Sequence, residues 1–257
     1  MSNLVFEKYA EKIKSLEKDY IKVDAETVSK SPLEDPLEIK ENKFGGLPFF
    51  PIEKEYPYDS KGNPMLLIAQ LNLLEIPNLK NFPDDGIIQV FSSVEEYGEY
   101  KVIFHDDEEV FYESITDFSF LDKLKKLKYF NYFFIRGVHQ LSFSITKDKG
   151  NFTDSTFINL FNSYSYKELK EELDKIDWET KDQYFNTKGN KIGGYSNFIQ
   201  EDPRSYKDHI SNYIQFLQIE SSEKIMFGDC GIFRILINKN DLYDIDFSNS
   251  VIEYDCY

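Results

Sequence analysis

Cysteine and histidine are scarce in this sequence, which limits the metal centres and disulfide frameworks it can form. Cys230 and Cys256 are too few for a disulfide framework, and the N-terminus lacks the apolar region of a secretory signal. We therefore expect reduced thiols and a cytoplasmic protein. His105, His139 and His209 form no H-E-x-x-H motif and do not pair with a cysteine at zinc spacing. We expect no metal site and no cofactor.

Long apolar runs and familiar catalytic motifs are also missing. Nowhere do about 18 uncharged apolar residues follow one another, which excludes an ordinary membrane-spanning helix. The sequence has no phosphate-cradling glycine loop and no G-x-S-x-G elbow. Cys230 follows Asp229, whose negative charge disfavours the thiolate that a nucleophile needs. Whether the protein is an enzyme stays open at this level.

Basic residues are outnumbered by acidic ones, 30 against 46, and the formal net charge is −16. Nucleic acid repels such a chain unless one face is locally basic. The densest lysine run, at 123–128, alternates with leucines at helical spacing, which is typical of an amphipathic helix with a solvated lysine face. We expect no nucleic-acid partner, and the acidity instead favours docking to a basic protein.

The sequence is rich in apolar residues: 41% are hydrophobic and 16% aromatic, mostly Phe and Tyr, which favour strands. We predict an α+β fold that is mainly β. An apolar stripe at steps of three and four predicts an N-terminal helix over about 3–22. Connecting helices are expected within 116–187, the clearest at 165–178. Strands are predicted at 65–73, 84–93, 100–105, 132–145, 214–221, 231–238 and 251–257.

Three landmarks recur in the same order in the two parts of the chain. Glycine pairs occur at 45–46 and 193–194. Gln70 lies 25 positions after Gly45, and Gln218 lies 25 positions after Gly193, so both landmarks recur at an offset of 148 (45 to 193). A glycine before a strand then repeats at an offset of 145 (86 to 231). We interpret this as an internal duplication, since internal repeats mark related structural units. Without a flexible linker, the two halves should pack as one compact domain over 1–257, with halves at about 40–115 and 188–257.

The first glycine pair begins the stretch "KFGGLPFFP". Gly45 and Gly46 can adopt positive φ or allow a close backbone approach, and Pro48 and Pro51 stiffen the segment that presents Phe49. Two interpretations remain open. The stretch is either a binding loop or a buried structural corner.

Other polar residues stand out in apolar surroundings. Gln70 and Gln218 occupy equivalent places in strands, where a buried amide needs partners. They could lock the two halves together or hold a ligand between them. Asp229 lies between Gly228 and Gly231 and suits a turn. The candidate ligand-binding residues are Gly45, Gly46, Phe49, Gln70, Gln218 and Asp229.

The motifs "KFGGLPFFP", "LLIAQLNL", "DDGIIQVFSS", "MFGDCGIFRILI" and "YDCY", in this order, resemble the YwqG-like family, a bacterial domain of unknown function. The resemblance runs from about Lys43 to the C-terminus. This chain has Tyr56-Pro57 where members usually carry Trp-Pro, and Tyr254 where a tryptophan is frequent. The resemblance implies a β-rich, internally duplicated fold and no agreed reaction, cofactor or catalytic residue. Related domains occur near toxin–immunity loci.

Two functional hypotheses follow from these observations. The first is a non-catalytic cytoplasmic binding protein, in its sharpest form an immunity-like protein whose acidic surface docks a basic partner. The second is an enzyme or small-molecule binder with its site in the cleft between the two repeats. The sequence leaves both open, together with the oligomeric state.

Overall fold

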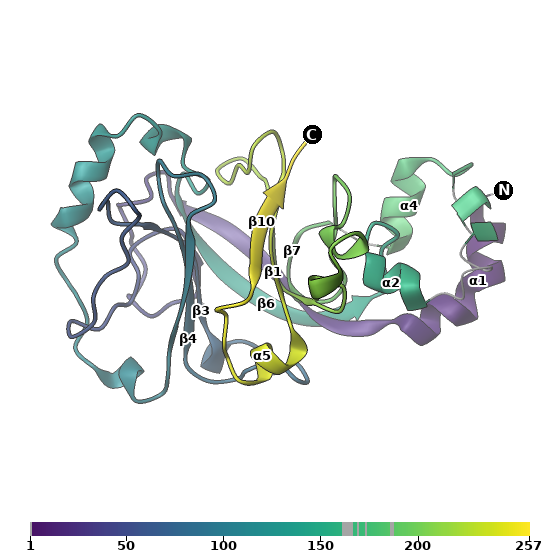
Figure 1. The fold of residues 1–257 in the computed structure, drawn as a ribbon, viewed down its shortest axis with the longest axis horizontal. Helices are drawn as coiled ribbons and strands as arrows, with labels where there is room; N and C mark the ends of the chain where they lie inside the picture. The colour runs from purple at the N-terminus through teal and green to yellow at the C-terminus, as the bar shows by residue number, and fades with distance from the viewer. Residues whose placement is uncertain (1, 161–166, 169, 173, 186–187) are drawn as a thin grey trace.

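A ten-stranded antiparallel sheet forms the body of the protein (Figure 1). The computed structural model describes residues 2–160, 167–168, 170–172, 174–185 and 188–257. The strand order is β10-β9-β8-β7-β1-β6-β2-β3-β4-β5. The sheet nearly closes on itself: the ring of Tyr254, on the edge strand β10, lies 5.7 Å from the ring of Tyr97, in the loop before the other edge strand β5. The prediction of a mainly β fold is confirmed.

One α-helix precedes the first strand, and the other helices lie in the connections between strands. The strands are β1 (Lys18–Ser29), β2 (Lys43–Phe44), β3 (Leu66–Asn72), β4 (Ile87–Ser92), β5 (Tyr100–His105), β6 (Val138–Asp148), β7 (Asn190–Gly193), β8 (Ile214–Glu220), β9 (Ile232–Ile237) and β10 (Val251–Asp255). The α-helices in the described residues include α1 (Ser2–Leu16), α2 (Ser155–Leu160), α4 (Trp178–Phe185) and α5 (Lys239–Tyr243). Short 3-10 helices include η1 (Leu73–Glu75), η2 (Glu109–Phe111), η3 (Ser119–Lys126), η4 (Phe130–Tyr132), η5 (Pro203–Ser205) and η6 (Asp208–Ile210).

The two long strands β1 and β6 pair antiparallel at the centre of the sheet, from Lys18 opposite Asp148 to Ser29 opposite Val138. Figure 1 shows them as the long purple and teal ribbons that cross the molecule together. Strands β2 to β5 continue the sheet from β6, whereas β7 to β10 continue it from β1. Strand β1, which comes first in the chain, thus adjoins the strands that come last.

The N-terminal helix is shorter than its predicted range of 3–22. It ends at Leu16, and β1 begins at Lys18. Tyr20 falls within the range predicted as helix, but it lies on β1 and is only 1% exposed. The β-branched side chains of Ile21 and Val23 fit a pleated surface, and pairing with both β6 and β7 stabilises the extended chain.

The lysine-rich helix also needs correction. The lysine-rich segment forms the 3-10 helix η3, with Leu121 and Leu124 buried and its lysines exposed. Part of the helix expected at 165–178, including its start, lies outside the described residues. The predicted halves at 40–115 and 188–257 leave out β1 and β6, although these strands form the centre of the sheet.

The main apolar core continues through both sides of the sheet. Every residue of β3, β4 and β9 is buried, so these strands are covered on both faces. A single cluster joins residues from β3 and β4 to residues from β8 and β9. Burial of apolar side chains on both faces is the main contribution that stabilises such a sheet.

Two buried lysines stand next to the centre of the sheet, one on β2 and one on β7. Lys43 Nζ lies 2.8 Å from Asp35 Oδ2, and Lys191 Nζ lies 3.0 Å from Asp148 Oδ2. All four side chains are at most 3% exposed. Each aspartate also accepts the backbone N–H four residues after its lysine, at 2.9 Å in both cases. The two ion pairs therefore fix the loops that follow the two glycine pairs.

The second glycine of each pair makes room for this carboxylate. Gly46 and Gly194 have φ of +81° and +74°, a region that L side chains rarely adopt. A Cβ at Gly46 would overlap the Asp35 carboxylate, and one at Gly194 would lie 2.7 Å from Asp148 Oδ2. These positions require glycine for both conformation and space.

Asp148→Ala tests the buried pair. It leaves the Lys191 ammonium buried without a counter-charge, so we expect a loss of about 3–5 kcal/mol in the free energy of unfolding. Asp24→Ala on β1 is the control, because Asp24 pairs with Lys22 through side chains at least half exposed, and its loss should cost under about 1 kcal/mol. Urea titration measures both variants. Equal losses of unfolding free energy in the two variants would contradict a stabilising role for the buried Lys191–Asp148 pair.

Candidate functional site

The stretch "KFGGLPFFP" forms a buried corner in the structure. Phe49 is 0% exposed and Phe50 is 1% exposed, and their rings pack against His105 at 5.5 and 5.4 Å. Gly45 adopts φ of +70°, and a Cβ there would overlap the carbonyl oxygen of Gly137. The stretch therefore presents no aromatic ring to a ligand.

The Gln70 amide fixes this corner from within the sheet. Its Oε1 accepts from the Phe49 backbone N–H and from Gln89 Nε2, both at 2.8 Å. Its Nε2 donates to the carbonyl oxygens of Ile39 and Glu41 at 2.8 and 2.9 Å. These four bonds satisfy the amide within the protein, so Gln70 has no free group to offer a ligand.

Gln218 plays the same part on the other side of the sheet. Its Oε1 accepts from the Asn197 backbone N–H at 2.9 Å, and its Nε2 donates to the Gly189 carbonyl at 2.9 Å. No hydrogen bond joins Gln70 to Gln218 in the structure. Each glutamine thus fixes a loop on its own side and does not lock the two sides together.

His105 and Asp229 lie apart from any shared site. His105 Nε2 lies 3.0 Å from Gln89 Oε1, and burial lowers the pKa of His105 to about 4, so the ring is neutral at pH 7. Asp229 is exposed in its turn, where its backbone carbonyl accepts from the Tyr257 N–H at 3.4 Å. Among the described residues, no three His, Cys, Asp or Glu side chains gather in a way that could hold a metal ion.

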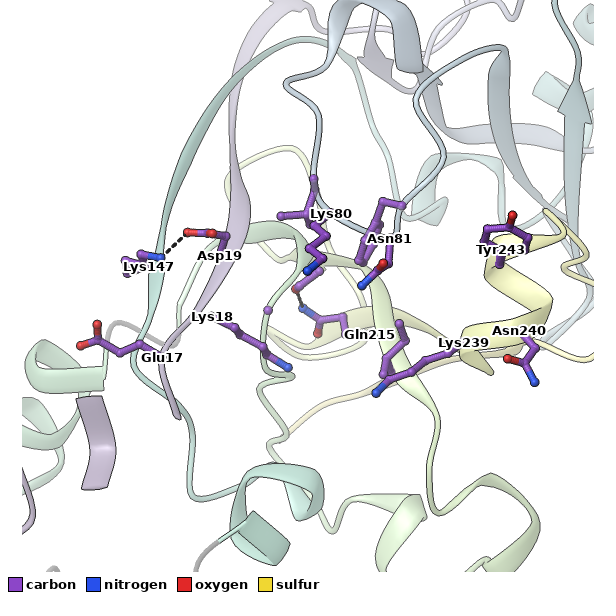
Figure 2. A pocket seen from close by; sticks show the side chains of 15 residues that line it. Glu17, Lys18, Asp19, Lys80, Asn81, Lys147, Gln215, Lys239, Asn240 and Tyr243 are labelled. Carbon is purple, nitrogen blue, oxygen red and sulfur yellow. Dashed lines mark hydrogen bonds and ion pairs between the residues drawn. The ribbon is translucent and has the colours of Figure 1, made fainter. Parts of the chain in front are cut away.

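A pocket of about 610 Å³ lies elsewhere, where β1, β6, β7 and β8 meet a loop from the first part of the chain (Figure 2). Its volume is in the range of small-molecule sites. The loop at 79–82 comes from the first predicted half, whereas β7, β8 and α5 come from the second. The lining residues are Glu17, Lys18, Asp19, Leu79, Lys80, Asn81, Phe82, Lys147, Gly193, Gly194, Ile214, Gln215, Lys239, Asn240 and Tyr243.

Lysines dominate the charge of this pocket. Figure 2 shows the ends of Lys18, Lys80 and Lys239 directed toward the space around the Gln215 amide. None of these three ammonium groups forms an ion pair within the described part of the chain. Lys147, by contrast, binds Asp19 at 2.7 Å. Three elements far apart in sequence thus supply positive charge that the protein leaves unpaired.

Lys18 is the least solvated of the three. Its Nζ lies 3.6 Å from the centre of the Tyr195 ring, a cation–π contact. Burial lowers the pKa of Lys18 to about 8, and the nearby charges of Asp154 and Asp148 oppose that shift. The group is still mostly protonated at pH 7, and a bound anion would favour its charged form.

Gln215 carries an unsatisfied group at the floor of the pocket. Its Nε2 donates to the Gly193 carbonyl at 2.6 Å, and the side chain is 1% exposed. Its Oε1 has no hydrogen-bond donor among the described residues. A buried acceptor without a donor costs about 1–3 kcal/mol, so a donor supplied by a ligand would stabilise this site.

A protein-family model matches residues 42–256: DUF1963, a domain of unknown function. The chain belongs to the DUF1963 family. No curated protein matches the chain. The DUF1963 match begins after β1, yet β1 supplies Lys18 and Asp19 to the pocket. In the described part of the chain, no helix has the length and apolar character needed to cross a membrane.

Sequence reasoning missed most of the residues that line the pocket. Lys18, Lys80 and Lys239 are isolated lysines in an acidic chain, and no local pattern links them. Gln215 lies in a stretch with an ordinary strand pattern, and nothing in that pattern marks it as a pocket residue. The one usable signal was the second glycine pair, because Gly193 and Gly194 lie in the pocket wall.

The pKa of Lys18 predicts a pH dependence of stability. The unfolded chain has the ordinary lysine value of 10.5, so between pH 8 and 10.5 it binds more protons at this residue than the folded protein does. The Lys18 contribution to the free energy of unfolding therefore rises with pH across this window. Urea titrations should show a steeper rise for the natural protein than for Lys18→Met. Parallel curves of unfolding free energy against pH for the two proteins would contradict the lowered pKa of Lys18.

Proposed function

We propose that this protein binds a small molecule in the pocket between the two sides of its sheet. The observation that carries the proposal is the convergence of three unpaired lysines and the unsatisfied Gln215 Oε1 in one cavity. The unsatisfied Oε1 of the buried Gln215 is costly unless a ligand supplies a donor, and the exposed ammonium groups of Lys80 and Lys239 leave their charge available to an anionic ligand. The pocket lining contains no histidine and no cysteine, and its charged groups are four lysines and two carboxylates.

We also propose that the fold arose by internal duplication. Lys43, Gly46 and Gln70 recur as Lys191, Gly194 and Gln218 at one offset, and each set makes corresponding contacts. The duplicated unit would include β1 and β6 as its first strands, so that β2 to β5 correspond to β7 to β10. Each first strand then completes the sheet of the other unit. This exchange, with the shared apolar core, supports one compact domain over 1–257.

The finer family assignment is part of this proposal. The order of the motifs from Lys43 to the C-terminus favours the bacterial YwqG-like group within DUF1963. The scarcity of cysteine favours a cytoplasmic location.

A ligand panel tests the proposed function directly. Thermal shift with sugars, amino acids, nucleosides, carboxylates and organic phosphates should show at least one compound that raises Tm by mass action. Asn240→Trp places a large side chain in the pocket wall and should abolish that shift. Asn249→Trp, on an exposed loop outside the pocket, is the matched control and should keep it. A shift that survives Asn240→Trp would place binding elsewhere.

Docking to a basic protein is the second candidate function. Besides the net charge of −16, the exposed carboxylates of Asp84, Asp106 and Asp107 lie near Asp85, whose pKa is raised by desolvation and then by their charges. Repulsion of this kind is relieved when a basic surface docks.

A pull-down from host lysate at low salt tests this second function. We expect a stoichiometric basic protein that salt releases and that Asp84→Lys/Asp107→Lys no longer retains. The control Glu34→Lys/Glu223→Lys makes the same charge change at exposed sites elsewhere. Equal retention by both double variants would remove these aspartates from the interface.

A further inference from the structure

The charge of the pocket limits what can bind there. Four lysines and two acids line it, and one of the acids, Asp19, is already bound to Lys147. Lys43 and Lys191, by contrast, are buried, and each is paired with an aspartate. The ammonium groups of Lys18, Lys80 and Lys239 repel one another when they point into one space. A ligand with at least two negative charges would neutralise them.

The other end of the pocket has a different character. Figure 2 shows Tyr243 and Asn240, both on α5, at the side of the pocket away from Lys18. Tyr243 is 82% exposed although it lines a cavity, so its ring is free to contact a ligand. Phe82 adds a second, half-buried ring to the lining. Exposed aromatic rings beside a cavity stack well with flat ring systems, by about 1–3 kcal/mol per nucleobase.

The polar groups between the two ends fit the rest of such a molecule. Asn81 offers an amide, and Asn240 offers a second one beside Tyr243; both can donate and accept along the edge of a heteroaromatic ring. Gln215 Oε1 is enclosed beside the pocket without a donor, and a sugar hydroxyl next to the lysines would supply one once the side chain turns toward the cavity. A volume of about 610 Å³ accommodates an anionic group, a sugar and a ring together.

We infer that the pocket binds a nucleotide, with its phosphates at Lys18, Lys80 and Lys239 and its base against Tyr243. The inference rests on the proposed function and names the ligand class for the same site. The phosphates are held by lysine charge, which explains how the chain could bind them without a glycine-rich phosphate loop. Strong attraction to a compact cation cluster also predicts that binding weakens as salt rises.

Isothermal titration calorimetry on the full chain with ADP, adenosine, pyrophosphate and citrate tests this inference at low salt. We expect ADP to bind most tightly, pyrophosphate more weakly, and adenosine most weakly, because only ADP uses both ends of the pocket. Citrate tests whether any polyanion suffices. It should bind more weakly than ADP, since it lacks a flat ring for Tyr243.

Variants separate the two ends of the pocket. Lys80→Glu and Lys239→Glu should each weaken ADP by at least about tenfold, whereas Lys126→Glu, an exposed lysine on η3 outside the pocket, should leave it unchanged. Tyr243→Ala should weaken ADP while leaving pyrophosphate unchanged. Tyr206→Ala removes an exposed ring elsewhere and is its control. Unchanged urea midpoints would show that each variant still folds.

The outcomes distinguish the inference from the proposed function. If ADP binds no more tightly than pyrophosphate or citrate, and Tyr243→Ala changes nothing, the nucleotide inference is overturned. If only neutral compounds from the panel bind, and Asn240→Trp abolishes their binding, the inference fails while the proposed function stands. If no compound binds, both fail.

Discussion

The burial of two lysine ammonium groups beside the centre of the sheet is the constraint on which the rest of the structure depends. A charge removed from water must be paired and hydrogen-bonded, and Asp35 and Asp148 meet that need for Lys43 and Lys191. Each aspartate can reach its lysine only because a glycine at positive φ stands beside it. The same carboxylates then fix the following loops through backbone N–H groups.

The candidate site depends on one of these pairs. Asp148 accepts the Tyr195 N–H, and the Tyr195 ring lies under the Lys18 ammonium. Asp148 also faces Lys18 in the register of β1 and β6. The ion pair at Lys191 thus holds the wall of the pocket as well as the corner of the sheet. Lys191, which stabilises the fold, and Lys18, which lines the pocket, thus lie near the same carboxylate, but only Lys191 forms an ion pair with it.

The pocket forms on one side of the sheet because the corresponding place on the other side is filled. Gly45, which matches Gly193 in position, packs against Gly137 and Ile135. Ile135 in turn forms a bridge with Ile225, so the segment before β6 closes this corner. Gly193 instead faces Leu79 and Phe82, which are side chains of the pocket wall. The two similar corners therefore differ because different side chains pack on them: the corner at Gly45 is filled, whereas the corner at Gly193 borders the pocket.

The sequence by itself determined the apolar strands, the recurring glycine pairs and glutamines, and the acidic balance, because each is written in neighbouring residues or in composition. It could not reveal β1, whose charged, alternating residues become a strand only between β6 and β7. Nor could it bring Lys18, Lys80 and Lys239 together, since their proximity follows from strand order and loop packing rather than from spacing. The tertiary structure alone decided where unpaired charge collects, because electrostatic cost depends on distance through space and not along the chain.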